Sequence, residues 1–268
     1  MIAMNFILVD GSYYIFFRYH ALLVWWRHAM ANSDISEPTQ APEFIDKFKS
    51  TFATKLKEIP KKLKIKDKYV MMIAKDCPRK AIWRNEHFQQ YKATRESDDS
   101  IMASPFFAAS YDSLFAEAGV DTILSYPHLE ADDCVAITTR HILGTYPDAH
   151  VWIIASDMDY AQLANDRTSI ITLKFTNLLA SKHCSGNADK DLFCKIVSGD
   201  KSDNIPAVLP RCGPKTAARY YEDRSSFEKK LDETEGAREL FERNKRIVSF
   251  DCIPHHLVEG FRRECLRL

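Results

Sequence analysis

The chain of 268 residues is 46% apolar and 12% aromatic, which is enough for one large domain or for a domain with an appendage. Scarce glycine and the lack of any biased tract exclude a long disordered or fibrous protein. The 37 basic and 37 acidic residues balance, but residues 47–95 carry 15 basic and only 4 acidic side chains, a local excess of positive charge.

Cysteine spacing and hydropathy indicate the cellular compartment in which the protein is expected. The seven cysteines include no C-x-x-C pair, so zinc spacing is absent and a reduced, cytosolic protein is the simplest interpretation. Residues 13–26 are apolar and aromatic, but Arg18 and His20 interrupt a run that is too short to span a membrane. No signal-peptide pattern is present at the N-terminus. We therefore expect a cytoplasmic protein with no membrane partner.

The first predicted strand covers residues 5–9 and is followed by Asp10. Its unbroken apolar run is typical of a strand buried in a parallel sheet, and the aromatic-rich stretch after it predicts a helix. Taken alone, Asp10 fits a turn or a helix N-cap as well as a functional site. An amphipathic helix follows, with apolar residues at helical spacing: Phe44, Phe48, Phe52, Leu56 and Ile59. The lysines around that helix fit a solvated surface.

A second strand, at residues 69–74, is also followed by an acid, Asp76. Parallel strands that each deliver a carboxylate at the carboxyl end build a site along that edge of an open α/β sheet. Residues 79–104 are polar, with aromatic residues among the basic ones. By composition they cannot build a packed core alone, so we expect them to be mobile in the free protein.

Two further acidic clusters follow predicted strands. A helix over residues 107–118 ends at Gly119 as a C-cap, and a strand over residues 120–127 precedes an E-A-D-D run. Acids in a first helical turn are stabilised by the helix dipole, but three acids in four residues exceed that need. The strand at residues 149–156 is followed by a D-x-D pair, whose carboxylates share a target only where the pleat is broken. A last strand, over residues 168–174, is expected at a sheet edge.

A carboxylate pair and a predicted anion-binding site lie close together in residues 198–221, SGDKSDNIPAVLPRCGPKTAARYY. Asp200 and Asp203 are three residues apart, a spacing that puts side chains on one helix face. The turn at Gly213 leaves backbone N–H groups free at the start of the next helix, which suits a phosphate. The segment therefore fits a protein that holds a phosphodiester next to metal ions.

Nine carboxylates gather at four predicted strand ends and one turn: Asp10, Asp76, Glu130, Asp132, Asp133, Asp157, Asp159, Asp200 and Asp203. Like charges packed together raise one another's pKa, so such a cluster is unfavourable without cations. Hard oxygen ligands favour Mg²⁺, with Mn²⁺ as a substitute, over zinc. Two such ions would activate the attacking water and stabilise the leaving oxygen, with no His or Cys nucleophile.

These motifs resemble the 5′-nuclease superfamily, which contains flap endonucleases, phage 5′–3′ exonucleases and the nuclease domain of bacterial DNA polymerase I. GDKSDNIP and GPKTA are similar to its helix–three-turn–helix element, and EADD and DMDYAQL to its metal-ligand runs. VDGSYYIFFRYHAL is similar to its opening strand and helix, and IWRNEHFQQYKATR to its arch entrance. Ala207 replaces a glycine of the family pattern, and VLPRC makes the hairpin about one residue longer.

The resemblance implies roles for individual residues. The first ion would be held by Asp10, Asp76, Glu130 and Asp132. The second would be held, partly through water, by Asp133, Asp157, Asp159, Asp200 and Asp203. Arg84 and Lys92 would reach the scissile phosphate. DNA contacts would come from Arg18, Arg79, Tyr91, Arg95, Gly213, Lys215 and Thr216, with K⁺ as a candidate ion at the hairpin.

The resemblance also implies an architecture and an activity. The expected fold is α/β, with a mostly parallel, PIN-like sheet in residues 1–187, a helical arch at about 79–104, and a helical DNA-binding region in residues 188–268. The expected protein is a stand-alone, monomeric Mg²⁺-dependent 5′–3′ exonuclease or flap endonuclease of DNA replication or repair. It would cut near a 5′ end, flap, nick or gap, leave 5′-phosphate products, and work in the cytosol of a bacterium or a phage-infected host.

Several alternatives remain open. A PIN-type ribonuclease shares the strand-end acids but lacks the helix–three-turn–helix element. A catalytically inactive DNA-binding module would be expected to lose some of the acids, and none is lost. Exonuclease and flap endonuclease activity, and DNA and RNA–DNA hybrid substrates, also stay as alternatives.

Overall fold

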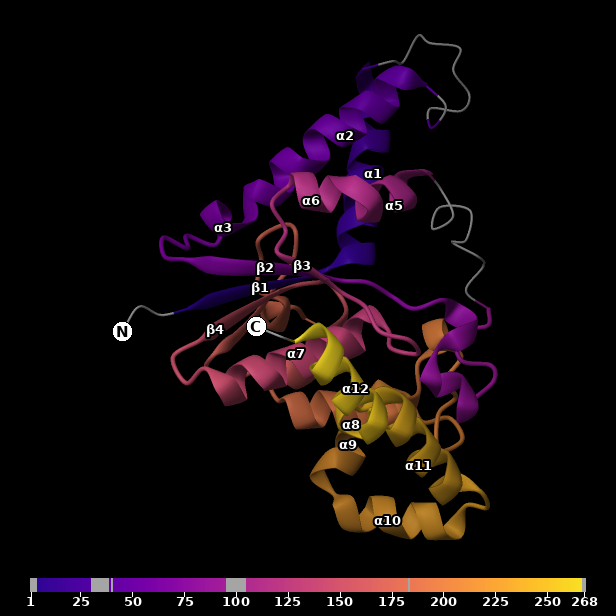
Figure 1. Cartoon of the computed structure of the whole chain (residues 1–268). Coiled ribbons are helices and arrows are strands. Elements are labelled where there is room, and N and C mark those ends of the chain that lie inside the picture. The colour runs from indigo at the N-terminus through magenta and orange to yellow at the C-terminus, as the bar shows by residue number, and fades with distance from the viewer. Residues whose placement is uncertain (1–3, 30–38, 40, 95–104, 183, 267–268) are drawn as a thin grey trace.

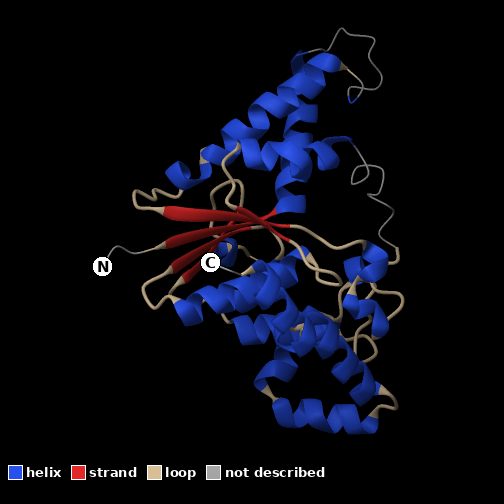
Figure 2. Ribbon diagram, viewed as in Figure 1, coloured by secondary structure: helices blue, strands red, loops and turns tan. Residues whose placement is uncertain are grey.

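A five-stranded sheet forms the centre of the molecule (Figure 2). The computed structural model describes residues 4–29, 39, 41–94, 105–182 and 184–266. The strands pair in parallel in the order β3-β2-β1-β4-β5. They are β1 (Asn5–Asp10), β2 (Tyr69–Ala74), β3 (Thr122–Leu124), β4 (His150–Ile154) and β5 (Thr168–Ile171). The predicted α/β class, the parallel sheet and the edge position of the last strand are confirmed.

Helices cover both faces of the sheet (Figure 1). Above it lie α1 (Gly11–Ala29), α2 (Pro42–Lys57), α3 (Ile59–Lys62), α5 (Pro105–Ala109) and α6 (Phe115–Glu117). Below it lie α7 (Ala131–Thr145) and α12 (His255–Cys265). Alternate side chains of a strand point to opposite faces, so Ile7 and Val9 of β1 join the upper core while Phe6 and Leu8 join the lower one.

A smaller helical lobe follows the sheet region. It contains α8 (Ala188–Ser198), α9 (Pro214–Glu222), α10 (Arg224–Glu233) and α11 (Ala237–Val248). Phe193, Phe227 and Leu231 form its own apolar core. The chain then returns to the sheet, because Phe261 of α12 is buried in the lower core next to α7. The predicted boundary at residue 188 coincides with the start of α8, whereas the last helix packs on the first region.

Residues 79–94 pack against the rest of the protein through buried side chains. They form two short 3₁₀ turns, Arg79–Ala81 and Trp83–Glu86, followed by further turns. Ile82 and Tyr91 are buried against Ile247 and other apolar side chains. These residues build no core alone, since their few apolar side chains use surfaces from the helical lobe. Their mobility in the protein without DNA stays a prediction. Residues 95–104 of the predicted arch lie outside the described residues.

Two other expectations concern strand length and covalent state. The third strand covers three of the eight predicted residues, because it pairs only with Met72–Ala74 of β2. All seven cysteines are free thiols. Within the described ranges, the helices are too short or too polar to cross a lipid bilayer.

Candidate metal centre

Acidic side chains gather at the carboxyl edge of the sheet, as parallel strands require. Asp10 is the last residue of β1; one of its oxygens accepts a hydrogen bond from the Tyr13 N–H at 2.9 Å and the other from the Tyr160 hydroxyl at 2.9 Å. Asp76 accepts from the Ser12 hydroxyl at 2.6 Å and from the Ala131 N–H, at the start of α7, at 2.8 Å. These bonds hold both carboxylates in fixed directions.

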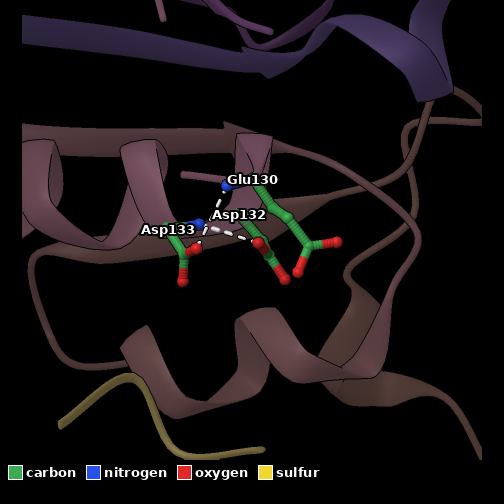
Figure 3. A group of neighbouring side chains, drawn as sticks. All are labelled: Glu130, Asp132 and Asp133. Atoms are coloured by element: carbon green, nitrogen blue, oxygen red, sulfur yellow. Dashed lines mark hydrogen bonds between the residues drawn. The ribbon is translucent and has the colours of Figure 1, made fainter. Parts of the chain in front are cut away.

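The E-A-D-D run lies at the first turn of α7, where its three acids project from neighbouring positions (Figure 3). One carboxylate oxygen of each of Glu130, Asp132 and Asp133 lies within 4.8 Å of the others. Asp133 accepts a bond from the Glu130 N–H at 3.1 Å, and Asp132 accepts from the Asp133 N–H at 2.8 Å. The run therefore caps the helix and also gathers negative charge.

Arg84 is buried under this turn, with 2% of its side chain exposed. Its two terminal nitrogens donate to Asp133 at 2.8 Å each, and one of them also donates to Glu130 at 2.9 Å. The remaining nitrogen, Nε, donates to the Ile247 carbonyl of α11 at 2.7 Å. All three guanidinium nitrogens are thus engaged by protein oxygens.

This position does not fit two of the predicted roles. Arg84 was expected at the scissile phosphate, but the structure places it in a buried ion-pair network that it would have to leave. Asp133 was expected at the second ion, but its two oxygens already accept bonds from Arg84, and one also accepts from the Trp83 indole at 2.9 Å. The sequence motif alone could not show which side chain lies opposite the acid.

Lys92 connects the packed segment to the same acids. Its ammonium lies 2.6 Å from the free oxygen of Glu130, while the Tyr91 hydroxyl donates to the other oxygen at 3.2 Å. The Lys92 backbone N–H donates to the Asp203 carbonyl at 3.1 Å. The structure thus brings Lys92 to the acidic edge, and its contact with the scissile phosphate stays a prediction. Tyr91 is 6% exposed, so its predicted DNA contact does not fit this placement.

A second acidic cluster surrounds a lysine that the sequence analysis did not select. The Lys195 ammonium lies 2.6 Å from an oxygen of Asp159 and 3.0 Å from an oxygen of Asp200. Asp157 accepts a bond from the Asp159 N–H at 3.0 Å and caps a 3₁₀ turn, so the pleat is broken there as predicted. Asp203 is buried at the end of another 3₁₀ turn, residues 201–203, which takes the place of the helical face expected from its spacing to Asp200.

Burial and neighbouring charge divide the acids into two kinds. Burial, with Asp76 and Asp157 nearby, raises the pKa of Asp10 to about 7 although Tyr13 and Tyr160 oppose it. Burial also raises the pKa of Asp159 to about 6, and burial with Asp133 raises that of Asp132 well above its usual range. Despite burial, Lys92 and Arg84 lower the pKa of Glu130. Clustered oxygen ligands with raised pKa values fit a divalent cation such as Mg²⁺.

The arginines predicted to contact DNA lie in different surroundings. Arg18 is half-buried in α1, its Nε is buried without a hydrogen-bond partner, and Glu58 is among the charges near it. Arg79 is half-buried, and its carbonyl accepts a bond from Asn85 at 2.8 Å. Arg95 lies outside the described residues. Their roles on DNA stay predictions.

The predicted phosphate seat has fewer donors than expected. Gly213 is the N-cap of α9, and the first helical residue, Pro214, has no N–H to offer. The Thr216 N–H donates to the Gly213 carbonyl at 2.9 Å. Space at Gly213 is open, since no atom lies within 4 Å of an added Cβ, and the Lys215 side chain is exposed. Charge on Lys215 is therefore the stronger part of this seat.

Comparison with known proteins identifies the family. The family model described as 5'-3' exonuclease, N-terminal resolvase-like domain, matches residues 5–189. The chain belongs to this family. The match confirms the resemblance, and it contains the predicted acids from Asp10 to Asp159 but ends before the Asp200 turn.

Three curated relatives of this family member illustrate the match. The 5'-3' exonuclease of Bacillus subtilis is 27% identical over 158 residues, 56% of this chain and 51% of that protein. A 5'-3' exonuclease of Buchnera aphidicola is 27% identical over 220 residues, 80% of this chain and 64% of that protein. The flap endonuclease of Escherichia phage T5 is 26% identical over 141 residues, 48% of each. The matched stretches thus span about half to two thirds of these relatives.

Solved structures confirm the fold over the whole chain. The phage T5 D15 protein, co-crystallised with metal ions, superposes with a TM-score of 0.68 at 19% identity and covers 98% of both chains. A variant of the T5 D15 flap endonuclease in a complex with DNA and metal ions gives a TM-score of 0.67 at 20% identity. The helical lobe is therefore part of the shared fold.

Replacing Arg84 by Met should destabilise the protein by about 3–5 kcal/mol, because it leaves buried Asp133 without a cation and removes one of the two cations of Glu130. Urea unfolding measures this loss. Lys80→Met, at an exposed position of the same segment, is the control and should have little effect. An Arg84→Met protein of unchanged stability with reduced cleavage would instead support contact with the phosphate.

The raised pKa of Asp10 predicts a pH-dependent stability. Between the ordinary value of 3.8 and the native value of about 7, the folded state binds more protons than the unfolded state, so stability falls as pH rises. Without metal, the melting temperature of Asp10→Asn minus that of the parent should therefore increase from pH 5 to pH 8. His141 and His150 are present in both proteins, so their opposite contribution cancels. A pH-independent difference would contradict the raised pKa.

Proposed function

We propose that this protein is a divalent-metal-dependent 5′-nuclease that hydrolyses phosphodiester bonds near the 5′ end of DNA and leaves 5′-phosphate products. The observation that supports this most is the set of buried acids with raised pKa values at the carboxyl edge of the sheet. Clustered carboxylates repel one another, and cations bound there during catalysis would offset this repulsion. Family membership points to the same chemistry.

The two acidic clusters suit two ions, Mg²⁺ or, as a substitute, Mn²⁺. Asp10, Asp76 and Asp132, with Glu130 once Lys92 moves, would hold the first. Asp157, Asp159, Asp200 and Asp203 would hold the second, directly or through water. When bound, such ions lower the pKa of a water and stabilise the leaving oxygen. Asp133 and Arg84 would serve the site by fixing Glu130.

The remaining residues would bind and orient the nucleic acid. Lys92 lies at the acidic edge, where its charge can pass from Glu130 to a phosphate. Lys215 and the open backbone at Gly213 would contact a duplex phosphate, with K⁺ as a candidate ion at this hairpin. We expect a monomer that works in the cytosol. Its substrates would be 5′ ends, flaps, nicks or gaps of DNA, with RNA–DNA hybrids as a candidate further substrate. The helical lobe of α8 to α11 favours this function over a PIN-type ribonuclease.

Cleavage of matched 5′-flap, nicked, gapped and RNA–DNA hybrid substrates, with and without Mg²⁺, tests the function directly. Metal-dependent cleavage that requires a 5′ end is the expected result. Cleavage of single-stranded RNA alone would favour the ribonuclease, and DNA binding without cleavage would favour an inactive module.

The variant Asp132→Asn tests whether Asp132 acts as a metal ligand or only as a helix cap. As a ligand variant it should keep the fold, melt at a higher temperature without metal, lose most of the stabilisation by Mg²⁺, and cleave orders of magnitude more slowly. As a cap variant it would lose about 1 kcal/mol of stability and keep nearly normal turnover. Asp148→Asn, exposed in the turn between α7 and β4, is the control. Thermal melts with and without Mg²⁺ and single-turnover cleavage decide between them.

Lys215→Ala tests the phosphate seat of the helical lobe. Because each neutralised phosphate contributes about −0.9 to the log–log slope of DNA affinity against salt, the variant should flatten that slope by about one. Lys229→Ala, on exposed α10, is the control and should leave the slope unchanged. A loss of affinity confined to particular sequences would contradict backbone binding.

A further inference from the structure

Lys195 occupies the centre of the second acidic cluster. It is in the last turn of α8, and its ammonium bonds to Asp159 and Asp200, acids that come from separate parts of the chain. The three side chains are only 15–22% exposed, so these are partly desolvated ion pairs. Asp157 adds further negative charge to the lysine's surroundings. The ammonium is therefore the counter-ion of this cluster.

A divalent cation needs the same atoms. Mg²⁺ binds carboxylate oxygens at about 2.0–2.1 Å, and the ammonium stands 2.6 Å and 3.0 Å from the oxygens that face the centre of the cluster. An ion bound to both of these oxygens would stand where the ammonium stands, and it carries the same sign of charge. The lysine and the ion therefore exclude one another at this pair of oxygens.

We propose that Lys195 is a built-in cation of the second metal site, which neutralises Asp159 and Asp200 in the metal-free protein and is displaced when a divalent ion binds. This inference rests on the proposed function, since it assumes that the second cluster holds an ion during work. It makes Lys195 a residue that regulates metal occupancy, and it gives the cluster a stable state without metal.

The displaced side chain has space. A cavity of about 390 Å³ borders both Lys195 and Asp159 and continues between α8 and the start of α9. Ser198 lines it and offers a hydroxyl oxygen, and Asp191 offers a negative charge to the ammonium. Lys182 and Lys190 also line the cavity, and their positive charges repel the Lys195 ammonium. The ammonium is therefore less stabilised in the cavity than between the carboxylates of the cluster. This difference favours the inward position until an ion arrives.

Competition of this kind weakens the apparent affinity for metal. The ion binds only the fraction of molecules in which the lysine has withdrawn, so the apparent dissociation constant equals the intrinsic one divided by that fraction. If the withdrawn fraction is about one tenth, removing the lysine tightens binding about tenfold. The second ion should therefore bind more weakly in the parent than its acids alone would allow.

Chemical modification of the parent protein reports the displacement directly. Reductive methylation of lysine amines, followed by mass spectrometry, is measured without metal and with saturating Mg²⁺. Lys195 should be modified slowly without metal and about tenfold faster with it, since the ion frees the amine. Lys190, on the same helix and paired with Glu222 at 2.6 Å, is the matched control and should not change. Unchanged or slower modification of Lys195 in Mg²⁺ would overturn the proposal.

Mn²⁺ binding to Lys195→Met, measured by calorimetry, gives an independent test. The variant should bind the weaker of two Mn²⁺ ions about tenfold more tightly than the parent and melt at a lower temperature in chelator. Lys229→Met, exposed on α10 and outside the cavity lining, should match the parent. Equal or weaker Mn²⁺ binding by Lys195→Met would overturn the lysine proposal alone, whereas a parent that binds no Mn²⁺ would overturn the metal centre of the proposed function. The methylation test uses the parent chain and does not depend on the folding of any variant.

Discussion

The buried guanidinium of Arg84 is the interaction on which the acidic edge depends. A charge removed from water is costly unless it is paired and fully hydrogen-bonded, and here each guanidinium nitrogen donates to a protein oxygen. The partners come from the first turn of α7 and from the end of α11. The Arg84 side chain therefore holds Glu130 in place and connects residues 79–94 both to the start of α7 and to α11 of the helical lobe.

The same network explains why the acids differ so much from one another. Glu130 and Asp133 are paired with cations of the chain, whereas Asp10 and Asp132 are packed among other acids and neutral hydroxyls. Despite burial, Lys92 and Arg84 lower the pKa of Glu130, whereas burial and nearby acids raise the pKa of Asp10 and of Asp132. At Asp159, burial outweighs the ion pair with Lys195, and the pKa is raised to about 6. The acidic edge thus contains carboxylates that side chains of the protein neutralise and others, such as Asp10 and Asp132, that are free to bind added cations.

Sequence patterns predicted the framework better than the site. Strands β1, β2 and β4 fall close to their predicted bounds, because a buried parallel strand is a continuous apolar run that a sequence shows directly. The π-helical turn at residues 110–114 was not predicted, since no periodicity in the sequence marks it. The acids themselves were found from their places at strand ends.

What the patterns missed were partners distant in the chain. Arg84 and Asp133 are 49 residues apart, so spacing motifs could not show that they pair. Lys195 was overlooked for a different reason: a lysine in the last turn of a helix is an ordinary complement to the helix dipole. Only the fold brings the Asp159 and Asp200 carboxylates around it. Polar residues with such long-range partners need the structure before they acquire a role.

The described part of the predicted arch, residues 79–94, adds a last constraint. Lys92 and Asn204 both have a left-handed backbone, with φ of 55° and 62°, at the point where the two stretches meet. Each such conformation costs about 1–3 kcal/mol in a residue other than glycine, and it persists only where the surroundings fix it. Here the Lys92 N–H donates to the Asp203 carbonyl, and the Asn204 side chain donates to the Gln90 carbonyl at 2.8 Å. These two hydrogen bonds join residues 79–94 to the Asp203 turn. The backbone conformations that bring Lys92 to Glu130 and Asp203 to the second acidic cluster are therefore fixed by the same contacts.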